Sequence, residues 1–325
     1  MEILRDVIRS LKEIAALEDG EPVFPGCIAH KLDDKNFHEI KPEDGRIAFV
    51  DGGNALLLSA ANFALSFVRV YACTFHNNKK ISAKRKQFYV LTKTEIESDD
   101  VAYKTEIFDD WLEMPGFNSN DPTIREGLFA FDAAKIAGIA RRFGEWKMAS
   151  EISNVDMTVM DGTLQAGISN EKEFSEAAYK NAGKNNIILA ALSKTSSLVT
   201  STGNDLLSVL KRRGPDKWLY HPIADIENDD HKAEICAVKL HEHAKHAFRF
   251  EILKNQKEKL RDAASLLAAN SNDYQFPGYP FGLMDADKFA RVSERERIYL
   301  RSLFASLSID ESTSDAHDVL NRVFR

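Results

Sequence analysis

The sequence predicts an α/β protein in which one mixed β-sheet is flanked by helices. Two observations support this fold class. Apolar segments rich in aromatic and β-branched residues come first and are joined by short loops, which favour antiparallel neighbours. A β-α-β pattern follows later in the chain and implies parallel pairing. Antiparallel strands followed by parallel units are typical of the ribonuclease H-like architecture and do not fit a uniform doubly wound fold.

The first elements are a helix and three strands. Apolar residues at helical spacing predict an amphipathic helix over residues 1–18. Residues 19–45 are expected to be a loop. The run FVDGG (49–53) predicts a buried strand that ends at Asp51 in a tight turn. Further strands are expected at 63–75 and 88–91, with a basic patch between them, and residues 92–121 are expected to be irregular.

The second half alternates helices and strands. A T-x-x-E capping box, Thr123 to Glu126, predicts the start of a long helix that runs to about residue 149. The next strand, 155–160, also stops at an acid–glycine pair, Asp161-Gly162. The remaining expected elements are a helix at 172–183, a strand at 187–192, a helix at 204–213, a hairpin of strands 233–240 and 247–252, helices at 255–269 and 285–307, and a short terminal helix.

The chain lacks a convincing linker or internal repeat, so we expect one domain over residues 1–325. Its parts would be the helix 1–18, a core over 46–295 and a helical extension over 296–325. The chain has 43 Lys+Arg against 50 Asp+Glu and a formal net charge of −7. This balance argues against a broadly basic nucleic-acid coat but allows a local basic groove.

The composition also bears on where the protein resides. No stretch approaches the ~18 consecutive apolar residues of a membrane span. The charged start of the chain does not resemble a signal peptide. The three cysteines are too few and too scattered for a disulfide scaffold. We therefore expect a soluble, reduced protein of the cytoplasm that has no membrane partner.

Two strand-ending carboxylates, Asp51 and Asp161, are the strongest chemical feature. Each follows an apolar strand and precedes glycine, so adjacent central strands would place both acids at one rim of the sheet. Carboxylate oxygens there would suit Mg²⁺ or Mn²⁺. Asp-Gly is also an ordinary turn dipeptide. Both interpretations remain open from the residues alone.

Three further acids have simple structural explanations. Glu126 in the first helical turn can complete the capping box or act as a metal ligand, and spacing favours the cap. Asp285 resembles the N-cap of the late helix, and Asp287 resembles a first-turn acid; both are normal at the positive end of a helix.

Basic residues form two candidate DNA tracks. Lys84, Arg85 and Lys86 precede the aromatic strand at 88–91, and Arg212 and Arg213 end the helix 204–213. Cations beside aromatic platforms suit single-stranded DNA. A basic edge strand can equally be a solvated guard against aggregation, and positive charge is favoured at a helix C-terminus in any case.

The histidines His241, His243 and His246 cluster at the expected hairpin. A polar hairpin tip explains them better than zinc, because no cysteine pair or separated third ligand accompanies them. Motifs for nucleotide hydrolysis, esterase activity and dinucleotide binding are absent.

Taken together, several motifs resemble one known family. FVDGG, the pair Arg125–Glu126, MDGTL, SKTSSL (193–198), AVKLH (237–241) and FPGYPFGLMDAD (276–287) occur in the order found in the NurA nucleases, which work with a HerA-type hexameric DNA translocase. The resemblance spans roughly residues 46–295.

The resemblance implies a ribonuclease H-like core, a homodimer and Mn²⁺-dependent cleavage of DNA. Because a pair of divalent ions can supply what phosphodiester cleavage needs, we expect two ions, either Mn²⁺ or Mg²⁺. It implies exonuclease and single-strand endonuclease activity on single strands and duplex ends, in end resection and double-strand-break repair. By position, the metal ligands would be Asp51, Glu126, Asp161 and Asp287. Asp287 is preferred over Asp285 because relatives place His or Asp there. Lys194 matches the family lysine, and Tyr279 lies in the matched aromatic–proline motif and is expected to bind DNA.

Two alternatives belong to other functional classes. The chain could keep the fold and bind DNA or the translocase without cutting, although retention of the four acids argues against this. It could also be a phosphotransferase, because paired acid–glycine turns serve phosphate sites in related architectures.

Overall fold

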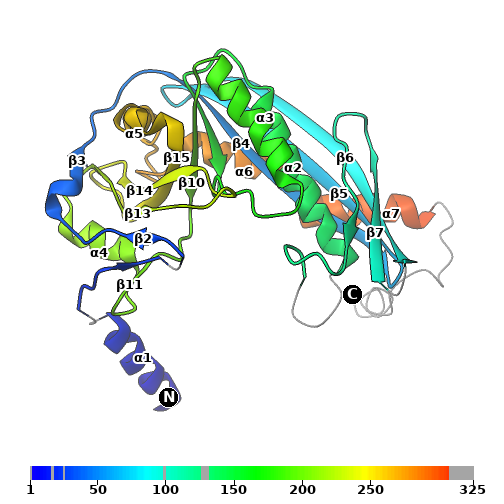
Figure 1. Cartoon of the computed structure of the whole chain (residues 1–325), viewed down its shortest axis with the longest axis horizontal. Helices are drawn as coiled ribbons and strands as arrows, with labels where there is room; N and C mark the ends of the chain where they lie inside the picture. Colours follow the sequence, from blue (N-terminus) through cyan, green and yellow to red (C-terminus); the bar gives the residue numbers. More distant parts are fainter. Residues whose placement is uncertain (1, 16–17, 25, 98–99, 126–131, 307–325) are drawn as a thin grey trace.

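The computed structural model describes residues 2–15, 18–24, 26–97, 100–125 and 132–306 (Figure 1). Its main feature is an 11-stranded mixed sheet. In spatial order the strands are β3 (Phe37–Glu39), β12 (Trp218–Tyr220), β14 (Ala233–Lys239), β15 (Phe248–Leu253), β10 (Ile188–Ser193), β9 (Met157–Asp161), β4 (Arg46–Ala60), β5 (Phe63–His76), β6 (Lys79–Glu97), β7 (Asp100–Phe108) and β8 (Phe117–Asn118).

The centre of the sheet has the predicted mixed pairing. β4, β5 and β6 form an antiparallel meander, whereas β9 pairs in parallel with both β4 and β10. The crossover from β9 to β10 contains α3 (Glu171–Lys184), and β14 and β15 form the predicted antiparallel hairpin. The α/β, ribonuclease H-like fold class is therefore confirmed.

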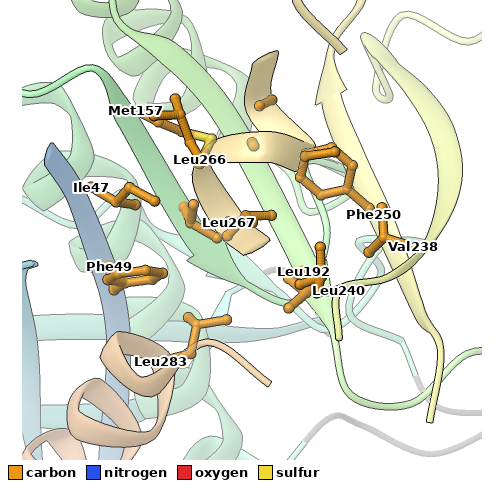
Figure 2. Close-up of a cluster of buried hydrophobic side chains, with 14 of the residues drawn as sticks. Ile47, Phe49, Met157, Leu192, Val238, Leu240, Phe250, Leu266, Leu267 and Leu283 are labelled. Atoms are coloured by element: carbon orange, nitrogen blue, oxygen red, sulfur yellow. The ribbon is translucent and has the colours of Figure 1, made fainter. Parts of the chain in front are cut away.

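Helices cover both faces of the sheet. Alternate residues of β4 point to opposite faces. Val50 packs in the core beneath α2 (Ile136–Ser150) and α3, and Phe49 packs in the core beneath α5 (Leu260–Ala269) and α6 (Phe281–Ala290). Figure 2 shows this second core, where Phe49 and Ile47 lie close to Leu283 of α6 and Leu266 of α5.

The remaining elements lie around this centre. They are α1 (Glu2–Ala15), α4 (Leu206–Arg213), α7 (Glu294–Ser306), the 3₁₀ helices η1 (Asp34–Asn36), η2 (Ala133–Lys135) and η3 (Lys254–Lys259), and two small sheets that pair β1 (Pro22–Val23) with β11 (Val199–Thr200) and β2 (Ile28–Ala29) with β13 (Ala224–Asp225). Within the described ranges, no helix combines the length and the apolar character that crossing a bilayer requires.

The strand that contains FVDGG, β4, does not end at Asp51 as the sequence suggested. β4 passes through Gly52 and Gly53 and runs on to Ala60, paired with β5 along this length. A Cβ at Gly53 would lie 2.4 Å from the carbonyl oxygen of Ala290, and one at Gly52 would lie 2.6 Å from Glu145 Oε1. These glycines therefore allow close approach from two helices rather than a turn.

The long helix predicted from Thr123 also differs. Thr123 lies in a turn, where its hydroxyl and its amide both donate to the Asp121 carboxylate. The helix α2 begins only at Ile136, after η2, which Asp132 caps. Glu126 lies outside the described residues.

Several other expectations also need correction. The basic patch 79–86 belongs to the continuous strand β6, and the region 92–121 contains the end of β6, β7 and β8. The loop region 19–45 contains short strands and η1. The late helix is two helices, α6 and α7, and Asp285 lies inside α6, whose N-cap is Pro280. The expected terminal helix lies outside the described residues.

Candidate metal centre

Three carboxylates from different parts of the chain converge at the centre of the sheet. One ligand atom from each of Asp51, Asp161 and Asp287 lies within 4.8 Å of the others. Among the described residues, these three acids are the one set of side chains placed to share a metal ion. The histidines of the 241–246 turn do not belong to this set.

Strand register brings the first two acids together. β4 and β9 run in parallel with Val50 opposite Met160, so Asp51 and Asp161 are the next residues on neighbouring strands. β9 ends at Asp161, where Gly162 adopts a positive φ of 104°. Glycine adopts this conformation at little steric cost. The parallel ladder with β9 ends at Val50, whereas β4 continues to Ala60.

Close packing of α6 supplies the third acid. A Cβ at Gly282 would lie 2.0 Å from the Phe49 ring, so only glycine allows α6 to lie this close to β4. Asp287 is carried toward Asp51 and Asp161 by this contact. Asp285 faces elsewhere: it accepts hydrogen bonds from Lys80 Nζ at 2.6 Å and Tyr71 Oη at 3.3 Å. The structure thus brings Asp287, and not Asp285, into the cluster.

The Asp51 carboxyl is the most perturbed acid. It is 7% exposed. Burial, followed by repulsion from Glu145 and Asp161, raises its pKa to about 7. The hydrogen bond that the Gly52 amide donates to this carboxyl lowers the pKa, but by less. A buried carboxyl with negative neighbours holds a proton until a cation compensates the charge.

Lys194 partly compensates the negative charge of the carboxylate cluster. Its Nζ lies 2.8 Å from Asp161 Oδ2 and 3.7 Å from Asp287 Oδ1. Burial lowers the pKa of Lys194, but the hydrogen bond to Asp161 and the surrounding carboxylates outweigh it, and the net pKa is raised. A positive charge therefore lies against two of the three acids.

Tyr279 completes this side of the cluster. Lys194 Nζ lies 5.7 Å from the centre of its ring. Its hydroxyl oxygen is buried and has no hydrogen-bond partner among the described residues. Burial, then the negative charges of Asp161, Asp51 and Asp287, raise the pKa of this hydroxyl, which therefore stays protonated and available as a donor.

Sequence reasoning missed one acid, Glu145 of α2. It is 4% exposed, and its charge is one of those that raise the pKa of Asp51. Its Oε1 accepts from Arg141 Nη1 at 3.0 Å and its Oε2 lies 3.5 Å from Arg142 Nη1. Its only signal in the sequence is weak: one acid follows two arginines in an otherwise apolar helical stretch. Glu126, the acid expected from the helix, cannot be placed, because it lies outside the described residues.

The predicted DNA-binding cations do not share one surface. Arg85 is paired in register with Tyr71, which is paired with Asp51, so these three residues point to one face of the sheet. Lys84 and Lys86 point to the other face; Lys84 donates to Glu151, and Lys86 lies over the Trp111 ring. Arg212 and Arg213 form ion pairs with Asp19 and Asp34.

The histidine hairpin shows local contacts. The ring nitrogen Nδ1 of His241 accepts from the His243 amide at 3.1 Å, and the two rings are 5.5 Å apart. These contacts lie within a turn, which agrees with the polar hairpin tip expected from the sequence.

Several solved structures are similar to this chain over most of its length. The NurA nuclease from Sulfolobus solfataricus has a TM-score of 0.55 and 15% identity over 94% of each chain. Endonuclease V from Ciona intestinalis, solved with an inosine-containing DNA, has a TM-score of 0.38 and 12% identity over 82% of this chain and 92% of that chain. The catalytic domain of human Endonuclease V has a TM-score of 0.36 and 12% identity over 94% of this chain and 98% of that chain.

No curated protein matches the sequence. The model of the NurA domain, however, matches residues 45–292. This range contains the whole carboxylate cluster and most of the chain. The chain therefore belongs to the NurA family.

Proposed function

We propose that this protein is a metal-dependent deoxyribonuclease that hydrolyses phosphodiester bonds. The observation that carries the proposal is the convergence of Asp51, Asp161 and Asp287 beside Lys194. Membership of the NurA family and structural similarity to a NurA nuclease support a nuclease.

The donor set fits a hard divalent cation. All three acids offer oxygen atoms, which Mn²⁺ and Mg²⁺ prefer over softer donors. Burial, and then the negative charges of Glu145 and Asp161, raise the pKa of Asp51, and a bound cation would compensate this carboxylate. Bound divalent ions, which we propose are two, would activate a water and stabilise charge on the leaving oxygen. Asp51, Asp161 and Asp287 would hold them, and we add Glu145 as a fourth acid beside Asp51.

The neighbouring side chains would act on the substrate. Lys194 would release part of its contact with Asp161 and place its ammonium on the phosphate that is cut. The unpartnered hydroxyl of Tyr279 would donate a hydrogen bond to the same phosphate or to the DNA backbone. Arg85 shares the sheet face of Asp51 and would contact the strand further along.

The finer functional assignment rests on the family. We propose exonuclease and single-strand endonuclease activity in DNA end resection and double-strand-break repair, together with a HerA-type hexameric translocase. We also propose a cytoplasmic homodimer and the use of Mn²⁺ or Mg²⁺. The remaining predicted DNA contacts, Lys84, Lys86, Arg212 and Arg213, would have to exchange their present partners for phosphates.

Degradation of linear DNA by the purified protein tests the proposal. We expect Mn²⁺-dependent degradation by wild type and loss of at least about 100-fold in rate for Asp51→Ala, in line with the several kcal/mol that metal-assisted charge stabilisation supplies. Asp229→Ala, which removes an exposed acid outside the cluster, should retain activity. Equal degradation by wild type and Asp51→Ala would reject the metal site.

The same preparation separates the alternatives. DNA binding without cleavage under any divalent cation would favour a non-catalytic DNA- or translocase-binding protein. ATP turnover without DNA, and no nuclease activity, would favour a phosphotransferase.

A further inference from the structure

A buried ion pair lies in the sheet two strands from Asp161, on β15. Glu251 is 0% exposed although it carries a carboxyl, and Arg249, two residues earlier on the same strand, is also buried. Arg249 Nε donates to Glu251 Oε1 at 2.7 Å. The second carboxyl oxygen, Oε2, lies 2.9 Å from Nε2 of the buried His231. We call Arg249, Glu251 and His231 the buried triad.

The buried triad keeps a charge where the sheet is otherwise apolar. Burial raises the pKa of Glu251, but the hydrogen bond from His231 and the charge of Arg249 outweigh it, and the net pKa is lowered. Its partners in register on the two neighbouring strands, Ala191 and Ile235, are buried and apolar. Replacing a buried ion pair by apolar side chains of similar volume is often neutral or stabilising. Stability alone therefore does not explain why the charge is there.

A further contact of the triad indicates its role. Glu251 Oε2 accepts a hydrogen bond from the Leu164 amide at 2.8 Å. Leu164 is 0% exposed and follows Asp161 by three residues. Its carbonyl oxygen accepts from Tyr179 Oη of α3 at 3.2 Å. The backbone of Leu164 is therefore held on one side by a strand and on the other by a helix.

The turn between Asp161 and Leu164 needs such an anchor. Its first residue, Gly162, has a φ of 104°, and the backbone of glycine is less restricted than that of any other residue. The ladder between β9 and β10 ends at Asp161. Just beyond it, Ser193 Oγ donates to the Gly162 carbonyl oxygen at 2.6 Å. The direction in which the chain leaves this glycine depends on the bonds that follow.

Arg142 supplies two of those bonds. Its Nη2 donates to the carbonyl oxygens of Thr163 and Gln165 at 2.7 and 3.1 Å. Arg142 is partly exposed, whereas Glu251 and Leu164 are completely buried. Water cannot replace the bond between these two residues, so this bond is the firmest anchor of the turn.

We propose that Glu251 is a positioning residue of the metal centre. Its bond to the Leu164 amide fixes the turn after β9 and thereby the direction of the Asp161 carboxylate. Arg249 and His231 keep Glu251 ionised and oriented for this bond. The inference rests on the proposed nuclease function and adds a residue that contacts neither the metal nor the DNA. Groups that orient metal ligands typically contribute about 10–100-fold in metal affinity.

Two double variants separate this role from that of a structural ion pair. Both carry Arg249→Met, so that removal of the carboxylate leaves no unpaired arginine in the core. Arg249→Met with Glu251→Leu, the leucine variant, lacks an acceptor for the Leu164 amide. Arg249→Met with Glu251→Gln, the glutamine variant, keeps an oxygen that can accept this bond and is the matched control.

Isothermal titration of the full-length protein with Mn²⁺, without DNA, gives the main readout. We expect the glutamine variant to bind Mn²⁺ like wild type and the leucine variant to bind at least about tenfold more weakly. The two variants should have similar melting temperatures. Hydrogen exchange over residues 162–166, measured by mass spectrometry, should be faster in the leucine variant alone. Its DNA cleavage should be slow at low Mn²⁺ and recover in part at saturating Mn²⁺, because the loss lies in binding the ion.

Tyr179→Phe keeps the test decisive if the leucine variant fails to fold. This change removes the hydroxyl that binds the Leu164 carbonyl and keeps the ring that packs in the core. Mn²⁺ binding should weaken by about threefold, the size expected for one ordinary hydrogen bond. Tyr299→Phe, which removes the hydroxyl of an exposed tyrosine on α7, should leave Mn²⁺ binding unchanged.

The outcomes distinguish the positioning role from the function on which it rests. Equal Mn²⁺ affinity in wild type and the folded leucine variant would overturn the positioning role, as would unchanged affinity in Tyr179→Phe. Equal weakening in both double variants would also overturn it, because the charge of the triad and not the bond to Leu164 would then act on the metal centre. A wild-type protein that neither binds Mn²⁺ nor cleaves DNA would overturn the nuclease function itself.

Discussion

At the scale of single residues, the cluster is a concentration of negative charge that the protein only partly compensates. Asp51, Asp161 and Asp287 meet within a few ångströms, and Lys194 supplies one positive charge. Such a site favours the folded chain only when its charge is neutralised by protons or by a cation. Two predictions follow from the residues at its centre.

The first concerns Asp51 in metal-free protein. Its pKa is about 7 in the folded state and near the ordinary 3.8 when unfolded. Between these values the folded state holds the extra proton, so this group lowers stability as pH rises from about 4 to about 7, with no further change above. Asp51→Asn removes the titration. Its stability advantage over wild type should grow over that range to at most about 4 kcal/mol.

Urea unfolding in EDTA at several pH values measures this difference. The comparison contains its own control, because wild type and Asp51→Asn should converge toward acid pH. A difference that is independent of pH would show that Asp51 ionises normally in the folded protein.

The second prediction concerns Lys194. Replacing it with Met removes a positive charge beside the acids, so the affinity for Mn²⁺ should rise by about tenfold, within the few kcal/mol of a close charge pair near a protein surface. DNA cleavage should nevertheless fall, since the phosphate loses a cation. Isothermal titration with Mn²⁺, without DNA, gives the first value, and Lys180→Met serves as the control. Weaker Mn²⁺ binding by Lys194→Met would contradict the proposed competition.

At the scale of elements, two helices approach β4 through its glycines. The backbone of α6 near Ala290 lies against Gly53, and the side chains of α2 lie against Gly52. This packing places Asp51 close to Asp287. It also places Asp51 near enough to Glu145 for the charge of Glu145 to raise the pKa of Asp51. Packing at these glycines should therefore control both stability and the geometry of the acids.

Gly53→Ala tests this packing. The new Cβ would lie 2.4 Å from a backbone oxygen, which cannot rotate away as a side chain can. We expect a loss of about 1–3 kcal/mol, the usual cost of overpacking, and weaker Mn²⁺ binding, because α6 carries Asp287. Gly138→Ala, in open space on α2, should instead gain about 0.5–1 kcal/mol. Thermal unfolding of the two variants checks this, and similar behaviour of both would refute the close-approach explanation.

The same elements show what the sequence could predict. The mixed sheet, the parallel β9–α3–β10 unit and the β14–β15 hairpin follow from periodicity and loop length, which are local properties. The dipeptide Asp-Gly, by contrast, is a turn at Asp161 and a continuous strand at Asp51. Only tertiary contacts distinguish these two cases. The helix start expected at Thr123 is wrong for the same reason, since Thr123 lies in a turn bonded to Asp121 and α2 begins only at Ile136.

The candidate site was predictable to a similar extent. Strand ends pointed to Asp51 and Asp161, whereas Asp287 required the family resemblance, because its spacing alone matched a first-turn acid. Glu145 was missed because a single acid within an amphipathic helix looks like a surface residue. It lies against Gly52 of β4, and this contact is tertiary, so the local sequence does not encode it.

At the scale of the whole molecule, α1 is the least covered element. It extends away from the rest of the structure (Figure 1). Its apolar side chains are exposed, including Ile3 at 81%, together with Leu4, Val7, Ile8 and Leu11. An amphipathic helix normally buries this face. We expect a second copy of the chain to cover it, in agreement with the homodimer proposed above.

Charged substitutions on the two faces of α1 test this expectation. Leu4→Glu combined with Leu11→Glu places two charges in the apolar stripe, and burying them unpaired would cost several kcal/mol. The double variant should therefore sediment as a monomer at concentrations where wild type is dimeric. Its melting temperature at high dilution should match that of wild type, because these side chains are exposed within one copy. Arg5→Glu, on the polar face, should remain dimeric. A wild-type monomer, or a double variant that still dimerises, would show that α1 does not join two copies of this chain.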